Sequence, residues 1–401
     1  MSLKSTLKKI VPLRVFYRAL YRSGLKYKLR QPIINLLRLS GMQVVDRNDL
    51  LKNNPFFFQD ADEVSSLKRK NVIEHEKFTE FENLVFPKPF VASIKNGELA
   101  GKDATGFDSQ GRVILETSWP QYTADHLSRI LSLRTLLSKK FSPYTHQDTV
   151  FSLVCPWDNN YFHWLIDCLT RLEGVMEYER KFGVKIKLLI RPNLQQYQVD
   201  SLKLLGYSEA DYQVWNGKRM LVNNLLVPSF RRSIKDEDGF YCHVSPASCR
   251  WLAEKIISNL PADIKAKPTP THIYVSRRNT LVRKVVNEQE VIQELEKLGF
   301  VDYVTEDLSF AEQVHLFANA KMIISPHGAG LTNIIFSKNL KLIELFAKTV
   351  PVASYYELCG GLGFDYAALL GDSPKGDLRT HDADMIVDIQ KLLAIVKEMS
   401  V

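Results

Sequence analysis

The chain has 401 residues, of which 45% are hydrophobic and 24% are charged, so it has the length of about two globular domains. It contains no run of about 18 apolar residues, and no apolar core follows its basic start, so we expect neither a membrane span nor a secretory signal. Five scattered cysteines without a CxxC pair are typical of free thiols in a reducing cytosol and argue against a disulfide framework or a zinc site: Cys155, Cys168, Cys242, Cys249 and Cys359.

The net charge of +8 is concentrated at the N-terminus. Residues 1–40 hold ten basic and no acidic residues, whereas the remainder has 43 basic and 45 acidic residues. Apolar residues alternate with these bases, as in an amphipathic helix on an anionic membrane surface. We therefore predict a basic N-terminal arm, residues 1–70, that binds such a surface through residues 1–40. A disordered or domain-packing arm is the alternative, and nucleic acid is disfavoured because the rest of the chain is not basic.

Residues 71–265 are predicted to form an N-terminal α/β domain. The Asn96-Gly97 and Gln110-Gly111 pairs indicate hairpin turns between antiparallel strands over 84–119, and a helix is expected over 121–140. Strands and helices then alternate, and Ser245 and Pro246 begin the last helix as N-cap and first residue. The predicted strands are 149–157, 185–190 and 219–229, and the predicted helices are 161–172, 194–205 and 245–260. The proline-rich segment 261–271 is the expected linker.

Residues 272–375 show a clearer alternation of strands and helices. Asn287 is the predicted N-cap of one helix, and Ser309 with Glu312 forms a capping box at the next. Strands separated by helices predict a parallel sheet that binds its ligand at the carboxyl ends of the strands. We expect this unit to face the first across a cleft, and a final helix at 384–399 to pack back on the first domain.

The segment "IISPHGAGLTNIIF", residues 323–336, is the strongest local indication of a ligand. A strand ends at Pro326, and a loop with Gly328 and Gly330 leads into a helix near Thr332 and Asn333. Glycines allow backbone N–H groups to approach a ligand, and a helix N-terminus favours phosphate. The spacing matches neither GxGxxG nor a Walker A loop, which disfavours a dinucleotide-dependent dehydrogenase. His327, at the mouth of the loop, is either functional or structural.

Two further strand ends suggest the same ligand. Ser276 and Arg277 follow one strand, and Arg277 with Arg278 either grips a diphosphate or is an exposed pair. Glu344 lies inside an apolar strand, where a carboxylate needs a partner, either a ribose diol or a neighbouring arginine. Together these groups predict a nucleoside diphosphate or a similar ligand.

"YFHWLIDCLTRL", residues 161–172, places His163, Asp167 and Arg171 four apart on one helical face. They form either a surface stripe or part of an active site, and the spacing is not the HExxH zinc motif. We interpret Arg171 as structural. Asp-x-Asp triplets that could hold a metal occur at 60–62, 236–238 and 382–384, but none follows a long strand, so we interpret them as chance.

Four segments together resemble glycosyltransferase family 61, particularly its bacterial capsular-polysaccharide members, over about residues 84–370: "FHWLIDCLTRL", "YVSRRNTLVRKVVNE", "EDLSFAEQVHLFANAKMIISPHGAGLTNIIFSKN" and "LIELF". The resemblance implies a GT-B fold of two Rossmann-like domains, a nucleotide-sugar donor (a UDP-sugar is expected), and inverting transfer without a metal or other cofactor. Mapped onto this sequence, it implies donor-binding roles, beside those of Ser276 and Glu344, for Arg277, Arg283, Asn287, Pro326, His327, Gly328, Ala329, Gly330, Leu331, Thr332 and Asn333.

The predicted function is therefore an inverting glycosyltransferase in which His163 or Asp167 takes the proton of the acceptor hydroxyl. The sequence does not decide between these two residues. The acceptor is expected to be a surface glycan or its lipid-linked precursor, and the location to be cytoplasmic, at the inner face of a bacterial membrane. The alternative is a non-catalytic nucleotide-sugar or glycan-binding protein of the same fold.

Overall fold

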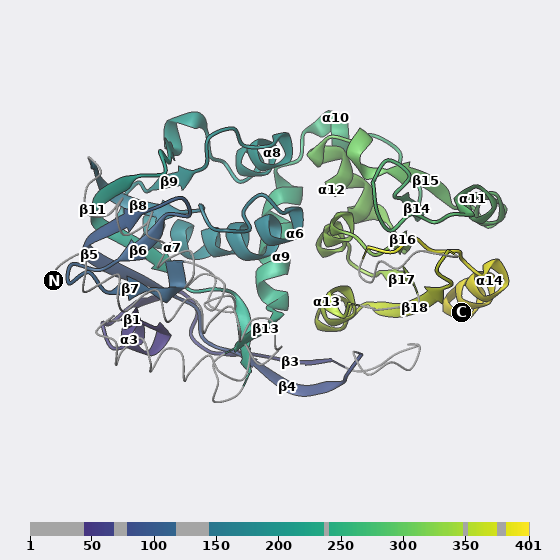
Figure 1. Cartoon of the computed structure of the whole chain (residues 1–401), viewed down its shortest axis with the longest axis horizontal. Coiled ribbons are helices and arrows are strands. Elements are labelled where there is room, and N and C mark those ends of the chain that lie inside the picture. The colour runs from purple at the N-terminus through teal and green to yellow at the C-terminus, as the bar shows by residue number, and fades with distance from the viewer. Residues whose placement is uncertain are drawn as a thin grey trace.

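The computed structural model describes residues 44–67, 78–117, 144–235, 240–347, 352–374 and 382–400, which form two lobes, each built on its own sheet (Figure 1). The predicted arm at 1–40, the predicted helix at 121–140 and the triplet at 236–238 lie outside these residues. Within them, no helix is long and apolar enough to cross a membrane.

The first lobe contains a nine-stranded sheet in the order β1-β7-β6-β5-β11-β8-β9-β10, with β2 also paired to β5. Strands β11, β8, β9 and β10 are parallel, whereas β5 is antiparallel to β11 and to β6. The sheet is therefore mixed, and only one half of it has the parallel arrangement of the Rossmann-like domain that we predicted. The strands are β1 (Val44–Val45), β2 (Phe56–Phe57), β5 (Phe90–Ala100), β6 (Thr105–Phe107), β7 (Val113–Ile114), β8 (Thr145–Ser152), β9 (Lys187–Ile190), β10 (Tyr212–Val214) and β11 (Arg219–Pro228).

One of the two predicted hairpin turns is wrong. Asn96-Gly97 lies inside the long strand β5, where Gly97 is packed so closely on β11 that a Cβ would lie 2.8 Å from the Cβ of Leu225. The Gln110-Gly111 turn is confirmed, because the Gly111 amide donates to the Asp108 carbonyl and the antiparallel strands β6 and β7 flank it. Local turn chemistry at Asn96-Gly97 gives way to a pairing with a strand more than 100 residues later.

The helices of the first lobe cover the face of its sheet that is turned toward the second lobe. Residues of β8 alternate between two cores, so that Phe151 joins the helices while Val150 faces the core under α3 (Arg47–Leu51). Ser245 is confirmed as an N-cap, since its hydroxyl accepts from the Ser248 amide, and Pro246 is the first residue of its helix. The helices are α6 (Tyr161–His163), α7 (Leu172–Phe182), α8 (Gln196–Leu204) and α9 (Pro246–Ser258). Two hairpins, β3 (Glu63–Leu67) with β4 (Phe81–Phe86) and β12 (Arg232–Lys235) with β13 (Phe240–Val244), complete the lobe.

The second lobe begins after the predicted linker, which includes the short helix α10 (Ala262–Lys265). Its five strands are all parallel, in the order β15-β14-β16-β17-β18. The chain passes from β14 to β15 on one side of the sheet, and from β16 to β17 on the other side. The carboxyl ends of the adjacent strands β14 and β16 therefore form the switch point at which such sheets bind ligands. The strands are β14 (His272–Ser276), β15 (Val301–Val304), β16 (Met322–Pro326), β17 (Lys341–Ala347) and β18 (Asp365–Gly371).

Helix starts in this lobe follow the predictions in part. The capping box of Ser309 and Glu312 at α12 (Phe310–Asn319) is confirmed. Asn287 does precede α11 (Glu288–Glu296), but its side chain makes two bonds to the backbone of Val387 instead of capping the helix. The glycine loop is shorter than predicted, because a 3-10 helix, η8 (Ala329–Phe336), already begins after Gly328.

The C-terminal helix α14 (Ile389–Ser400) lies on the second lobe, against β17, β18 and α11, and not on the first domain as we expected. Its apolar residues Leu392, Val396 and Met399 complete a core with Ile343 and Leu345 on that face of the sheet. Burial of this stripe explains the position.

An apolar contact joins the two lobes. Helix α9 runs along the boundary (Figure 1) and packs against α12, η8 and α13 (Ser354–Leu362). Side chains of both lobes belong to one cluster of buried residues, including Leu252 from the first and Phe310, Phe336 and Tyr355 from the second. This contact sets the helix that begins at Tyr161 beside η8.

Candidate active site

The predicted helix at 161–172 exists, but it is not regular. Helix α6 continues as a π-helical segment, η4 (Trp164–Cys168), then as a 3-10 turn, η5 (Leu169–Arg171), and then as α7. The side chain of Asn160 caps its start by accepting from the His163 amide. π-helical turns inside α-helices occur frequently at functional sites. Here the π turn carries Asp167.

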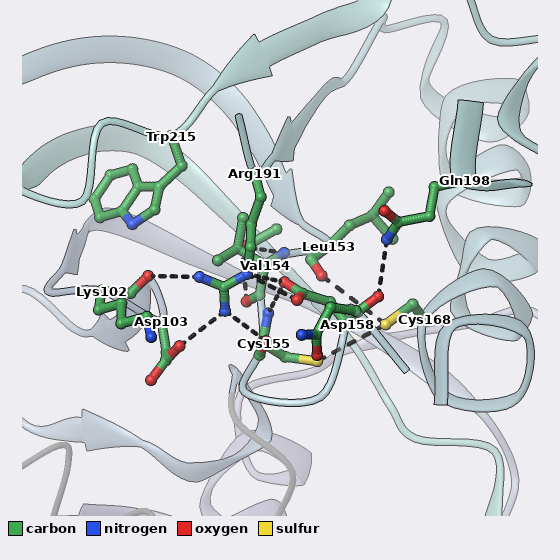
Figure 2. Close-up of polar contacts among 12 residues, drawn as sticks. Lys102, Asp103, Leu153, Val154, Cys155, Asp158, Cys168, Arg191, Gln198 and Trp215 are labelled. Carbon is green, nitrogen blue, oxygen red and sulfur yellow. Dashed lines mark hydrogen bonds and ion pairs between the residues drawn. The ribbon is translucent and has the colours of Figure 1, made fainter. Parts of the chain in front are cut away.

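The loop that leads into this helix is held by the side chain of Arg191 (Figure 2). The guanidinium donates to both carboxylate oxygens of Asp158 at 2.7 and 2.6 Å, to Asp103 at 2.8 Å and to the carbonyl of Cys155 at 2.7 Å. Asp158 in turn accepts from the Cys155 amide at 3.0 Å. Burial raises the pKa of Asp158, although the charge of Arg191 opposes the shift. This buried network fixes the direction in which α6 leaves β8.

His163 and Asp167 form a hydrogen-bonded pair that a third residue completes. His163 Nδ1 lies 2.8 Å from Asp167 Oδ2. Arg232, on β12, donates through Nε to Asp167 Oδ1 at 2.6 Å and through Nη2 to Oδ2 at 3.1 Å. Burial disfavours the carboxylate form of Asp167, but the Arg232 guanidinium and the His163 ring outweigh it and hold the pKa of Asp167 below its usual range.

Asp167 is therefore an anion at neutral pH, and it is only 3% exposed. Since a carboxylate only accepts hydrogen bonds, the proton between the two residues lies on His163 Nδ1. The other nitrogen, Nε2, then carries a lone pair. The His163 ring is half-buried, beside the rings of Trp157 and Phe162.

Arg171, the third member of the polar stripe, is structural, as predicted. It is 5% exposed, donates to the carbonyls of Pro228 and Glu116, and lies over the rings of Phe151 and Phe230. It braces the helix against the first sheet and does not face the second lobe.

On the second lobe, Arg277 and the glycine loop meet at the switch point of the sheet. A Cβ at residue 328 would lie 2.0 Å from Arg277 Nη1, so the absence of a side chain at Gly328 is what admits the guanidinium. Arg277 Nε is buried without a hydrogen-bond partner, and within the described residues no carboxylate pairs with this arginine. Burial and the neighbouring Arg283 lower the pKa of Arg277.

The neighbouring arginines are held differently. Arg283 is paired with Asp382 at 3.0 Å and has a left-handed backbone, with φ +59°. Arg278 is 44% exposed in its side chain and pairs with Asp302, which confirms the exposed alternative for this residue. Arg277 alone of the three thus directs an uncompensated charge at the loop.

Three predicted donor-binding side chains are engaged by the protein itself. The hydroxyl of Ser276 donates to Glu288 at 2.9 Å, and the amide of Asn287 binds the backbone of Val387. Glu344 is fully buried, accepts from Tyr366 at 2.7 Å and lies 2.5 Å from His327 Nδ1, and no arginine among the described residues pairs with it. These residues therefore support the site through hydrogen bonds within the protein.

The loop itself is stiffened by its own residues. Thr332 donates to the carbonyl of Ala329, the Tyr355 hydroxyl donates to the carbonyl of Gly328, and Leu331 is buried in the core. Gly330 lies close to Thr305, and Pro326 ends strand β16. The predicted residues from Pro326 to Asn333 are therefore brought together at one strand end.

The two halves of the site touch. Tyr161, two residues before His163, donates its hydroxyl to Asn333 in the loop at 2.6 Å. Phe162 lies against Tyr355, with ring centroids 6.1 Å apart, and Tyr355 lies 5.5 Å from His327. The helix of His163 and the glycine loop are thus neighbours, although some 165 residues separate them in the sequence.

Sequence reasoning missed Arg232, Tyr161 and Tyr355. A run of apolar residues that ends in "VPSFRR", residues 227–232, could have suggested a buried arginine. The two tyrosines gave no signal, because the partner of the Tyr161 hydroxyl lies in the other lobe and that of the Tyr355 hydroxyl lies 27 residues earlier in the chain, at Gly328. Within the described ranges, no three His, Cys, Asp or Glu side chains are grouped so that they could hold a metal ion.

Residues 161–343 match the model of the family Glycosyltransferase 61. The chain is also similar to proteins named EGF domain-specific O-linked N-acetylglucosamine transferase: 33% identical over 111 residues to that of Gallus gallus, which is 26% of this chain and 20% of the relative. The Drosophila melanogaster protein is 31% identical over 140 residues, 32% of this chain and 26% of its own length. The chain thus spans about a quarter or less of the curated relatives it matches.

Proposed function

We propose that this chain, a member of the glycosyltransferase 61 family, transfers a sugar from a nucleotide-sugar donor to a hydroxyl group of a glycan or its lipid-linked precursor. We expect the donor to be a UDP-sugar. In this proposal the two lobes act as the two domains of a GT-B enzyme, with the donor on the second lobe and the acceptor on the first. The bacterial capsular setting, the cytoplasmic location and membrane contact through residues 1–40 remain predictions. The two relatives described above come from animals.

The observation that carries the proposal is the charge of Arg277 beside Gly328. A half-buried guanidinium without a carboxylate partner is costly unless a ligand supplies the negative charge. Its position at the switch point of a parallel sheet, with Arg283 nearby, suits a diphosphate. The amide groups that follow Gly328 at the start of η8 add a positive dipole.

The geometry also favours His163 over Asp167 as the base. Both oxygens of Asp167 are engaged by Arg232 and His163, so it orients the ring and holds the proton on Nδ1. His163 Nε2 can then accept the proton of the acceptor hydroxyl while that oxygen attacks the anomeric carbon. Attack on the face opposite the leaving diphosphate inverts that carbon. The protein groups named here neutralise the leaving group in this proposal, with no metal assigned a step.

Donor binding is tested by thermal shift with NAD(P), UDP, GDP and CMP. We expect a nucleoside diphosphate to raise the melting temperature of the wild type but not that of Arg277→Ala. Arg278→Ala is the matched control, because the adjacent arginine is exposed and paired with Asp302. Stabilisation by NAD and by no nucleoside diphosphate would refute the proposal.

Turnover is tested with the stabilising nucleotide carrying different sugars. N-acetylglucosamine is the first sugar to try, since the relatives are named for its transfer. His163→Ala should lower the rate on the order of 10²–10⁴-fold with nucleotide affinity unchanged, as expected for loss of a general base. His146→Ala, an exposed histidine of β8, is the control. Nucleotide binding without turnover of any donor would instead favour the non-catalytic alternative.

A further inference from the structure

Two buried cysteines lie side by side where the chain enters the helix that carries His163. Cys155 is in the loop after β8, and Cys168 is the last residue of the π-helical segment η4, directly after Asp167. Their sulfur atoms are 3.8 Å apart, although the two residues are 13 positions apart in the chain (Figure 2). Both are free thiols in the structure, and the proposed transfer reaction uses neither of them.

The surrounding protein holds the two thiols in this arrangement. The amide of Cys155 donates to Asp158 at 3.0 Å, and its carbonyl accepts from Arg191 at 2.7 Å, so the backbone on this side is fixed. On the other side, the sulfur of Cys168 lies 3.9 Å from the carbonyl of Leu153. A disulfide has its sulfurs about 2.05 Å apart, so the pair has to close by roughly 1.8 Å. Rotation about the two Cα–Cβ bonds can supply this movement.

The environment of Cys168 disfavours the other common roles of a cysteine. The contact with Cys155 and burial raise the pKa of Cys168 well above its usual range, and the charges of two nearby aspartates add to the shift. A nucleophile or a metal ligand needs the thiolate, which this environment opposes. Within the described residues, no third histidine, cysteine or carboxylate joins the pair to form a metal site. A disulfide is uncharged, so neither burial nor the aspartates oppose it.

We propose that Cys155 and Cys168 form a disulfide that ties the loop after β8 to η4 when the protein meets a small disulfide such as oxidised glutathione. The thiolate of one cysteine attacks oxidised glutathione, which forms a mixed disulfide and releases one glutathione. The thiolate of the other cysteine then attacks the protein sulfur of the mixed disulfide, and the second glutathione leaves. Two electrons and two protons pass in total from the protein thiols to glutathione.

Because the two thiols are held next to each other, the second step is intramolecular and favoured over a lasting glutathione adduct. The bond would fasten the turn that carries Asp167 to the end of the strand that precedes it. This inference does not rest on the proposed function, since it concerns only the oxidation of two thiols.

The test uses the full chain with Cys242→Ser, so that only the four cysteines described by the structure are counted. One sample is incubated with excess oxidised glutathione and the other with dithiothreitol, each with a catalytic amount of protein disulfide isomerase, because buried thiols exchange slowly. After denaturation, we expect Ellman's reagent to detect four thiols in the reduced sample and two in the oxidised sample.

Peptide masses locate the bond. No lysine or arginine occurs between positions 141 and 170, so trypsin releases residues 141–171 as one peptide that contains Cys155, Cys168 and no other cysteine. We expect this peptide to be lighter by two hydrogen atoms after oxidation. The oxidised protein should also melt several degrees higher than the reduced protein, because the cross-link restricts the unfolded chain.

Cys155→Ala and Cys168→Ala should each abolish the difference in melting temperature between the two samples. Cys249→Ala is the matched control, because this cysteine is also buried and free, and the variant should keep both the lighter peptide and the higher melting temperature. If an alanine variant at the pair does not fold, the mass of the wild-type peptide decides alone.

Four thiols and an unchanged peptide after oxidation would overturn the inference. It would also be overturned by a glutathione adduct in place of the lighter peptide, or by a disulfide that lowers the melting temperature, since either would show that the sulfurs are not placed for this bond. Failure of nucleotide binding or donor turnover would refute the proposed function and leave this result unaffected.

Discussion

Replacement of Asp167 by Asn tests the arrangement on the first lobe most directly. The change removes the carboxylate charge that Arg232 contacts at 2.6 and 3.1 Å, and Arg232 is itself only 6% exposed. Breaking one side of a buried ion pair costs about 3–5 kcal/mol, so we expect Asp167→Asn to lower the free energy of unfolding by about that amount. The loss of orientation at His163 should also lower the transfer rate of the folded fraction.

The pH dependence has a defined sign. Because the pKa of Asp167 is lowered in the folded protein, its contribution to stability is fully present above the unfolded pKa, about 3.9, and is lost as the pH falls through the lower folded pKa. The difference in unfolding free energy between wild type and Asp167→Asn should therefore be constant near neutral pH and shrink in acid below about pH 4.

The measurement is urea unfolding followed by circular dichroism, at neutral pH and in acid. The double variant Asp167→Asn with Arg232→Met should recover much of the lost stability but not the activity, since it removes both charges of the buried pair without restoring the orientation of His163. Asp148→Asn, at an exposed carboxylate of β8, is the control. Equal unfolding free energy and equal transfer rate in Asp167→Asn and wild type would refute the role of this pair.

Three further outcomes are expected. Gly328→Ala should abolish the UDP-induced thermal shift, because its Cβ would overlap Arg277 Nη1. In the control Gly217→Ala nothing lies within 4 Å of the new Cβ, so the strain at φ +73° should lower the melting temperature of the free protein but leave the UDP-induced shift in place. A normal shift in Gly328→Ala would contradict the packing. In a Cys242→Ser background, the four remaining cysteines should react with Ellman's reagent only after denaturation, since all four are buried. In addition, the contact with Cys155 and burial raise the pKa of Cys168, and burial raises the pKa of Cys249 to about 12, so neither thiol is readily ionised. Rapid labelling of the native protein would show that the thiols are accessible. Deletion of residues 1–40 should abolish sedimentation with anionic vesicles and leave UDP binding intact, and unchanged sedimentation would refute membrane contact through the arm.

The second lobe was predictable from the sequence in most respects. Its strands and helices alternate with clear caps, such as Ser309 with Glu312 at α12, and each strand pairs with a strand that is one or two places away along the chain. The first lobe was less predictable, because β5 pairs with β11, more than 100 residues away. That long-range pairing overrides the turn signal at Asn96-Gly97.

The sequence by itself determined the kinds of groups in the site: the spacing of His163 and Asp167, the arginine after a strand end, and a loop with glycines after a buried strand. Only the tertiary structure decided what these groups do. Glu344 contacts His327 and not an arginine, Arg232 reaches Asp167 from a hairpin, and Tyr161 reaches Asn333 across the lobes. The physical reason is that the charge and proton state of a buried side chain depend on its partners, and here those partners come from segments far apart in the chain.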